Sequence, residues 1–407
     1  MRAGEGMTAA RRALLAAFVL GLGVSITLAQ TALTLLALLW LGRLCGRTAR
    51  DAGRWPLWRP VLAFGAVSVV SALLAPHPGA GLLACKKLLL VAALYVSVEE
   101  IDSAGQAGRV LSTLALAVAG AAALGLLQVS LCPGPEADYG LPRWLYHRCA
   151  RARGFFSSYM TLAGVVSLTL LATLPRLLLD TTFRPWLALA WFASLAGLAA
   201  TYTRGAWIGF ASGVLALWPA IRRWRWLLAV GLLMLGLAVL GGPQRLRERA
   251  LTMTNPDDVT VKERIYMWRS GIAMWREHPW LGVGPGGVKR DYRHYAQAEA
   301  FMQRTGHLHN SALQVLVETG VAGLLAWLWI WAAFFTEAVR LFRRLPAAAI
   351  RERALVAGSI AAITGFLVAG LTEHTFGDSE VVMLAWMIVA LPFTVRGART
   401  AGKPGTP

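Results

Sequence analysis

The chain has 407 residues, of which 57% are hydrophobic and only 15% are charged, and its mean hydropathy is positive. This composition excludes an ordinary soluble protein and indicates an integral membrane protein. A net charge of +19 would suggest nucleic acid for a soluble protein, but the basic residues here punctuate apolar segments and form no recognisable nucleic-acid-binding module. We therefore expect membrane lipids, and no nucleic acid, as partners.

Apolar segments of membrane-spanning length recur along the chain. A helix needs about 20 apolar residues to cross a bilayer, and this criterion predicts about twelve transmembrane helices. The first follows Arg11 and Arg12 without a convincing cleavage site, so we interpret it as a retained helix and not as a cleaved signal. We expect an all-α integral membrane protein, with residues 1–407 in a single polytopic domain. The predicted helices lie near residues 12–27, 28–43, 59–75, 82–98, 109–131, 157–176, 185–201, 204–219, 225–241, 311–335, 354–373 and 380–396.

Basic clusters between these helices set the predicted orientation. Arginines gather at 43–59, 222–225 and 340–353, which all lie on one side if the N-terminus is cytoplasmic, and positive residues favour the inside. Two loops then lie outside, 132–156 and 242–310. The second is far too long for a simple connector, which favours a functional role for it.

Cysteines give a weaker signal. Cys132 and Cys149 bracket the smaller outer loop, where a disulfide in an oxidising periplasm and two free thiols are the alternatives. The four cysteines show no metal-ligand spacing. In the longer loop, GVGPGG (282–287) formally matches a dinucleotide-binding pattern, but a Rossmann strand and helix are missing around it. We interpret it as a turn near the membrane surface, and we expect no cofactor.

Two histidines stand in GHLHNSALQVLVETG (306–320), where the long loop meets an apolar helix. Neither an HExxH motif nor a carboxylate cluster lies nearby in sequence, so we predict no metal site. Histidine titrates near neutral pH, which suits one ring to act as a general base. A histidine paired with a headgroup or a carbonyl at the interface is the alternative.

Arginines near the outer face add to this pattern. Arg204 lies in TYTRGAWIGF at a membrane boundary, where it could mark a substrate pathway or only reach the headgroups. KERIYMWRSGIAMWREHP (262–279) predicts an amphipathic helix along the surface, which carries Arg264 and Arg269. Guanidinium groups bind phosphate through paired, charge-assisted hydrogen bonds. Several of them facing a histidine predict a site for a phosphorylated, lipid-linked substrate.

In these segments, together with RARGFFSSYMTLAG (151–164) and HLHNSALQVLVETGVAGLLAWL (307–328), the chain resembles the O-antigen ligase and polymerase superfamily. The resemblance implies a type C glycosyltransferase-like fold of about twelve transmembrane helices with a large periplasmic loop. It implies a multi-pass protein of the bacterial inner membrane, with the active site facing the periplasm. It also implies metal-independent transfer of a glycan from an undecaprenyl-diphosphate carrier to an acceptor hydroxyl.

The resemblance also assigns residues. The catalytic histidine of the family, which is followed by Asn, is His309 here, and the essential arginines fall on Arg204 and Arg264. Arg269 is the alternative to Arg264, since both precede similar apolar spacing. Substrate-binding roles are predicted for Arg269, His307, Glu318, Arg151 and Arg153. For Glu318 a role at the start of the helix is an alternative, and for Arg151 and Arg153 a solvated basic loop is the alternative.

The leading interpretation is an O-antigen ligase that transfers the glycan to a lipid A core hydroxyl with inversion. An O-antigen polymerase and a protein O-oligosaccharyltransferase share the motifs and stay open, with acceptor choice unresolved. A lipid or polysaccharide transporter belongs to another class. It would predict mid-membrane charges and repeated halves with broken helices, which the sequence does not show.

Overall fold

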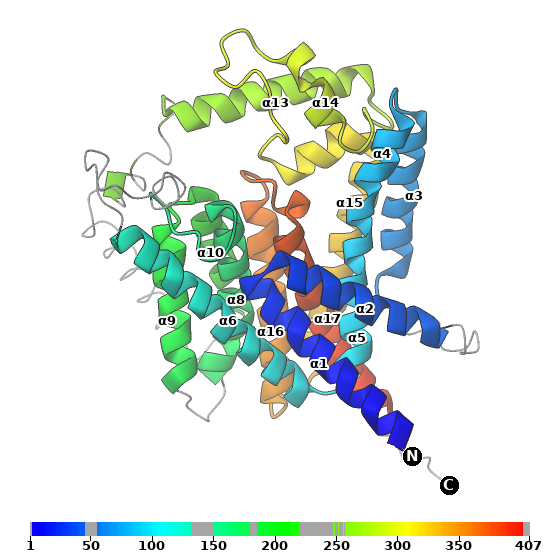
Figure 1. The fold of residues 1–407 in the computed structure, drawn as a ribbon, viewed down its shortest axis with the longest axis vertical. Coiled ribbons are helices and arrows are strands. Elements are labelled where there is room, and N and C mark those ends of the chain that lie inside the picture. The colour runs from blue at the N-terminus through cyan, green and yellow to red at the C-terminus, as the bar shows by residue number, and fades with distance from the viewer. Residues whose placement is uncertain are drawn as a thin grey trace.

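The computed structural model describes residues 2–44, 55–131, 150–179, 185–219, 247–248, 251, 255 and 257–401 (Figure 1). Across these residues the fold is all-α, as predicted. The helices are α1 Arg2–Val24, α2 Ile26–Leu44, α3 Trp58–Leu74, α4 Pro78–Ala84, η2 Cys85–Val91, α5 Ala92–Glu100, α6 Ala104–Ser130, α8 Tyr159–Leu179, α9 Pro185–Ala200, α10 Arg204–Ala216, α13 Val259–Glu277, α14 Gly287–Tyr295, α15 Ser311–Arg344, α16 Ile350–Ala369, η4 Thr375–Gly377 and α17 Ser379–Ala401.

Six helical stretches of the described chain are long and apolar enough to cross a membrane. They are Ile26–Arg43, Pro78–Glu100, Ala104–Ser130, Tyr159–Leu179, Ser311–Arg344 and Ile350–Ala369, and three shorter apolar helices accompany them, Trp58–Leu74, Pro185–Ala200 and Ser379–Val395. The chain is therefore a multi-pass membrane protein. The count of twelve stays a prediction, because α1 and α10 meet neither criterion and the expected helix 225–241 lies outside the described residues.

Most predicted segments coincide with helices of the structure, but one is not regular. The segment expected at 82–98 is built from α4, the 3-10 segment η2 and α5 in continuous succession. The smaller outer loop lies outside the described residues up to position 149, as do Cys45, Cys132 and Cys149. The alternatives of a disulfide and two free thiols therefore stay open.

Helices α13 and α14 lie across one end of the bundle, at the top of Figure 1, whereas the first residues of α1 and the last of α17 lie at the other end. The predicted amphipathic helix is α13. Its apolar side packs Met267 and Met274 with Val288, Leu308 and Val317 into a small core separate from the main one. Because this core includes Leu308, it fixes the loop that carries the two motif histidines.

The glycines of RGAWIG set α10 close to α16. A Cβ on Gly209 would lie 2.5 Å from the Gly365 carbonyl oxygen, and one on Gly205 would overlap Thr372. Small residues spaced by four let helix backbones approach in a membrane. The motif thereby brings the start of α10, with Arg204, beside the loop between α16 and α17.

A break at Gly320 divides α15. Gly320 has φ 68°, a left-handed conformation that glycine adopts without strain, and a Cβ there would overlap the backbone of Trp280. The GVGPGG turn docks on the short first part of α15, where Val283 N donates to Val317 O (2.9 Å) and Gly284 N to Glu318 O (3.0 Å). The turn expected from the sequence is therefore confirmed, and it holds the outer loop against α15.

Candidate functional site

The centre of the candidate site is a buried carboxylate, Glu373, in the loop between α16 and α17. Its side chain is only 7% exposed. Arg264 of α13 donates from Nη2 to Oε1 at 2.5 Å, and His309 Nδ1 lies 3.1 Å from Oε2. One carboxylate thus contacts two of the three residues that the sequence assigned to catalysis. Because Nδ1 of His309 faces this carboxylate, Nε2 is the ring nitrogen that does not contact it.

The third residue, Arg204, lies at the first turn of α10. Its side chain is 7% exposed, and Nη2 donates to Asp258 Oδ2 at 2.8 Å. Asp258 is also the N-cap of α13, since its side chain accepts from Thr260 N. Burial raises the pKa of the Asp258 carboxyl, but hydrogen bonds from Arg204 and Thr260 and the charge of Arg204 outweigh burial and hold this pKa well below its usual range.

Backbone strain marks both motifs. His309 has φ 48° and Tyr202, two residues before Arg204, has φ 52°. Positive φ is uncommon for residues other than glycine, and such residues cluster at functional sites. The folded structure therefore holds the chain in an unfavourable conformation at two of the three places where the predicted catalytic residues lie, and also at Leu57 before α3.

Several hydrogen bonds hold the histidine loop on α15. Asn310 caps this helix by accepting from Leu313 N at 2.9 Å. Gln314 Oε1 accepts from Leu308 N at 2.9 Å, and Ser311 N donates to Gly370 O at 2.7 Å. The loop carrying His309 and the loop carrying Glu373 are therefore tied to the same helix start, which fixes the distance between the two side chains.

His309 is the first of three histidine rings that lie next to one another, followed by His307 and His374. The ring centroids of His307 and His309 lie 4.2 Å apart, and those of His307 and His374 lie 5.5 Å apart. Burial, with the charges of His309 and Lys87, lowers the pKa of His307 to about 4 against the opposing effect of Glu373. Burial, with the charges of His307, Lys87 and His309, also lowers the pKa of His374 well below its ordinary value. Both rings are therefore neutral at pH 7.

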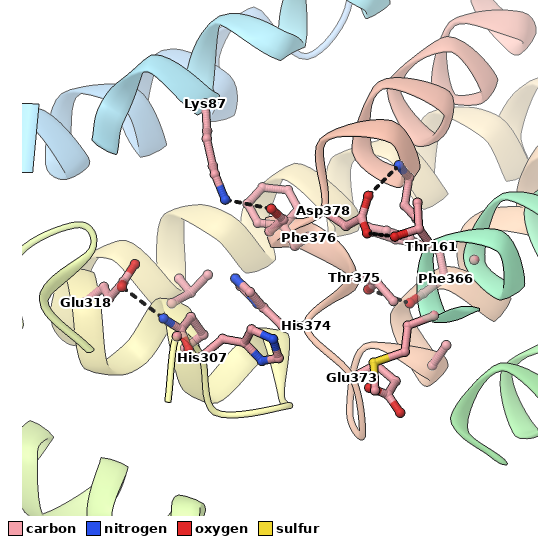
Figure 2. Close-up of a pocket in the computed structure, with 18 of the residues that line it drawn as sticks. Lys87, Thr161, His307, Glu318, Phe366, Glu373, His374, Thr375, Phe376 and Asp378 are labelled. Carbon is pink, nitrogen blue, oxygen red and sulfur yellow. Dashed lines mark hydrogen bonds between the residues drawn. The ribbon is translucent and has the colours of Figure 1, made fainter. Parts of the chain in front are cut away.

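A cavity of about 620 Å³ opens beside these rings (Figure 2). Its volume is that of a typical small-molecule site. Glu373, His307 and His374 line one part of it. Figure 2 shows Lys87 reaching into it from the α4–η2 side, where Nζ donates to Gly377 O at 2.7 Å. Glu373, which contacts Arg264 and His309, thus lies at the edge of a space that can hold a substrate, whereas Arg204, Arg264 and His309 do not themselves line it.

The remaining predicted binding residues lie in different places. Glu318 of α15 lines the cavity and accepts from Gln314 Nε2 at 2.9 Å. Arg151 and Arg153 stack over Tyr159, with guanidinium-to-centroid distances of 4.3 and 5.8 Å. Arg269 is exposed on α13 and lies outside the group around Glu373. Of the two alternatives on α13, the structure brings Arg264 into the site.

Sequence reasoning missed Glu373, Asp258 and His374. Carboxylates that pair with the catalytic residues carry no motif, and Glu373 lies 64 residues from His309. A signal existed in LTEHTFGD (371–378), which places several polar residues between two apolar segments. Among the described residues, no group of three or more His, Cys, Asp or Glu has an arrangement that could hold a metal ion.

Residues 188–328 carry an O-antigen ligase family domain (Wzy_C). This domain is found in O-antigen ligases, O-antigen polymerases and related glycan transferases, and it indicates lipid-linked glycan substrates and a bacterial membrane. The match covers about a third of the chain and contains Arg204, Asp258, Arg264 and His309, whereas Glu373 lies outside it. No curated protein matches the chain.

Proposed function

We propose that the protein is an inverting, metal-independent O-antigen ligase, which transfers a glycan from undecaprenyl-diphosphate to a hydroxyl of a lipid A core at the periplasmic face of the inner membrane. The observation that carries this proposal is the shared carboxylate: Glu373 contacts both Arg264 and His309. It sets a potential base and a phosphate-binding cation side by side. With the proposal goes a type C glycosyltransferase-like fold of about twelve spans.

In the proposed reaction, Arg204 and Arg264 bind the diphosphate of the donor and offset the negative charge that develops on the leaving oxygen. The acceptor hydroxyl attacks the anomeric carbon opposite that oxygen. Its proton passes to Nε2 of His309, while Glu373 accepts from Nδ1 and fixes the orientation of the ring. A bond forms from the acceptor oxygen to the anomeric carbon. The bond from the anomeric carbon to the phosphate oxygen breaks, and undecaprenyl diphosphate leaves.

In this structure Arg204 is paired with Asp258, and Arg264 is paired with Glu373. A carboxylate and a phosphate use the same donors of a guanidinium group. We therefore propose that the donor diphosphate replaces Asp258 on Arg204, whereas Glu373 keeps its place because it also holds His309. Arg269, Arg151 and Arg153 lie away from this group and would act earlier, in steering an anionic donor.

A polymerase or a protein O-oligosaccharyltransferase would use the same residues with another acceptor. The transporter interpretation, which calls for charges at mid-membrane depth, has less support. Arg204 and Glu373 pair with Asp258 and Arg264, which belong to the start of α13, the helix that lies across one end of the bundle (Figure 1).

Glycan transfer in purified membranes tests the proposal, with carrier-linked donor and lipid A core as acceptor. We expect transfer by the wild type and a loss of about 100-fold or more for His309→Ala, with no loss for His294→Ala, which removes an exposed ring from α14. Transfer by His309→Ala at the wild-type rate would exclude the base role. A wild type that lengthens carrier-linked chains or modifies a protein would instead identify one of the alternative acceptors.

A further inference from the structure

The acceptor has to approach His309 from the side away from the leaving diphosphate, because displacement with inversion places nucleophile and leaving group on opposite sides of the anomeric carbon. The rings of His307 and His374 lead from His309 along the cavity wall. They lead towards the part of the cavity that Lys87 enters (Figure 2).

Basic side chains lie near the GVGPGG turn. Lys87 of η2 and Lys289 of α14 both line the cavity, as do Pro285 and Gly286 of this turn. Arg290 lies directly behind this turn and donates from Nη1 to Pro285 O at 3.2 Å. We call Lys87, Lys289 and Arg290 the cationic corner.

The cations of the corner are poorly matched by protein groups. Within the described part of the chain, none of the three has a carboxylate within salt-bridge distance. Nε and Nη2 of Arg290 are buried and have no hydrogen-bond partner within the described part of the chain, although buried donors in folded proteins are normally satisfied. Arg290 does not itself line the cavity, so it contributes its positive charge from behind the turn.

One carboxylate, Glu318, lies near the corner, but its own hydrogen bonds are already made. It accepts from Gln314 Nε2 and from the backbone N–H of Gly286. Two further carboxylates line the same cavity, but both are already bound, Glu373 by Arg264 and His309 and Asp378 by Thr161. The neighbouring rings of His307 and His374 add no charge at pH 7. The net charge of the corner is positive, so it attracts an anion.

From these observations we infer a second anion-binding site at the cationic corner, where Lys87 and Lys289, with the charge of Arg290 behind them, hold a phosphate group of the acceptor while the acceptor hydroxyl lies at His309. This inference rests on the proposed function, because it assigns the acceptor side of the same reaction. It also gives a role to the GVGPGG turn, which fixes Arg290 behind Gly286 and places Lys289 at the cavity.

The test uses the full-length protein in nanodiscs of phosphatidylcholine, with donor and acceptor concentrations varied separately. Two variants are compared. K87Q/K289Q removes two cations from the corner, and K86Q/R276Q removes two exposed cations that do not line the cavity. The acceptors are a lipid A core with its phosphates and the same core after removal of its phosphates.

We expect K87Q/K289Q to raise the KM for the phosphorylated acceptor by about tenfold or more, because charge-assisted hydrogen bonds are lost, and to leave the donor KM unchanged. The wild type and K86Q/R276Q should prefer the phosphorylated acceptor, and K87Q/K289Q should not. An unchanged acceptor KM, or an equal rise in the donor KM, would overturn the inference.

Two further measurements distinguish the inferred acceptor site from a lipid-headgroup site and from a failure of the proposed function. If added phosphatidylglycerol competes with the acceptor in the wild type but not in K87Q/K289Q, the corner binds lipid headgroups and the inference is wrong. If the wild type transfers nothing to either acceptor, the proposed function fails. Binding of the two acceptors without donor then decides the inference by itself: phosphate-dependent binding that K87Q/K289Q loses supports it, and equal binding overturns it.

Discussion

Two buried glutamates at opposite ends of the bundle can be compared directly. Glu100, at the end of α5, is 6% exposed and pairs with Arg11 of α1 and Arg43 of α2, with nitrogen–oxygen distances of 2.8 and 2.6 Å. Glu373 is 7% exposed and pairs with Arg264 and His309. Burial is nearly the same, but both partners of Glu100 are arginines, whereas one partner of Glu373 is a histidine, a residue type that often serves as a general acid or base.

The two glutamates also differ in the parts of the structure that they join. Glu100 ties three helices of the bundle together, and Glu99 lies 3.5 Å from Arg43 as a further support. Glu373 instead joins a loop, a surface helix and a residue with a strained backbone. We therefore expect the ion pair at Glu100 to stabilise the fold, and we propose that the similar one at Glu373 positions reacting groups.

The largest effect that separates the two ends is expected for Glu373→Gln. The amide carries no charge to hold Arg264, and it orients His309 less well, so kcat should fall by about 100-fold. Glycan transfer by the purified variant measures this. Glu277→Gln, which changes an exposed carboxylate of α13, is the control. Normal kcat with a lower unfolding temperature would make Glu373 a fold-stabilising residue like Glu100.

Glu100→Gln should show the opposite pattern. It leaves Arg11 and Arg43 without their shared carboxylate, which should lower the free energy of unfolding by about 2 kcal/mol, while kcat stays near the wild-type value. Thermal unfolding in detergent measures the loss. Glu337→Gln removes an exposed carboxylate that pairs with Arg340 and should change little. A large loss of transfer in folded Glu100→Gln would contradict the assignment of this end to stability.

A smaller effect is expected for Asp258→Asn, which tests whether Asp258 competes with the donor for Arg204. Asparagine still caps a helix, so α13 should keep its start. The KM for the donor should fall by about fivefold, because the diphosphate no longer has to displace a largely buried carboxylate from Arg204. A rise in donor KM would show that Asp258 helps donor binding.

The same pair makes a prediction about pH. Because the pKa of Asp258 is lowered in the folded protein, its contribution to stability is complete above the pKa of the unfolded chain, about 4, and is lost as pH falls through the folded pKa. The difference in unfolding temperature between wild type and Asp258→Asn should therefore be constant above about pH 6 and should shrink as pH falls from 5 to 3. A difference that stays constant between pH 5 and pH 3 would contradict the lowered pKa.

The smallest effect concerns His307. Its pKa of about 4 in the folded protein lies below the ordinary value of 6.5, so the unfolded chain binds a proton first as pH falls. Stability from this group is complete above about pH 6.5 and is lost towards pH 4. His307→Asn should reduce the loss of stability between pH 7 and pH 5 by about 1 kcal/mol. An unchanged pH dependence would show that His307 titrates normally.

Much of the fold and part of the site could be predicted from the sequence, for identifiable reasons. Long apolar segments predicted most helices, and the alternation of apolar and basic residues predicted α13. Arg204, Arg264 and His309 lie in motifs with unusual residues at a membrane boundary. By contrast, the partners Asp258 and Glu373 are ordinary acidic residues in sequence, and only the packing of α10 on α16 and of α13 across the bundle brings them to the arginines.

Boundaries were harder to predict where backbone geometry departs from a regular helix. The 3-10 segment η2 has the composition of a transmembrane helix, and the break at Gly320 falls inside an apolar segment. Hydropathy does not record either feature, because both depend on contacts with residues that are distant in the sequence, such as Trp280.

The position of Glu373 limits how this protein can be recombined with its relatives. Residues 188–328 supply Arg204, Arg264 and His309, but the carboxylate that two of them share comes from residue 373, beyond that segment. A chimera that exchanges only the family domain would join a foreign arginine and histidine to the native glutamate loop. Grafts designed to change glycan or acceptor preference should therefore carry residues 370–378 along with the domain.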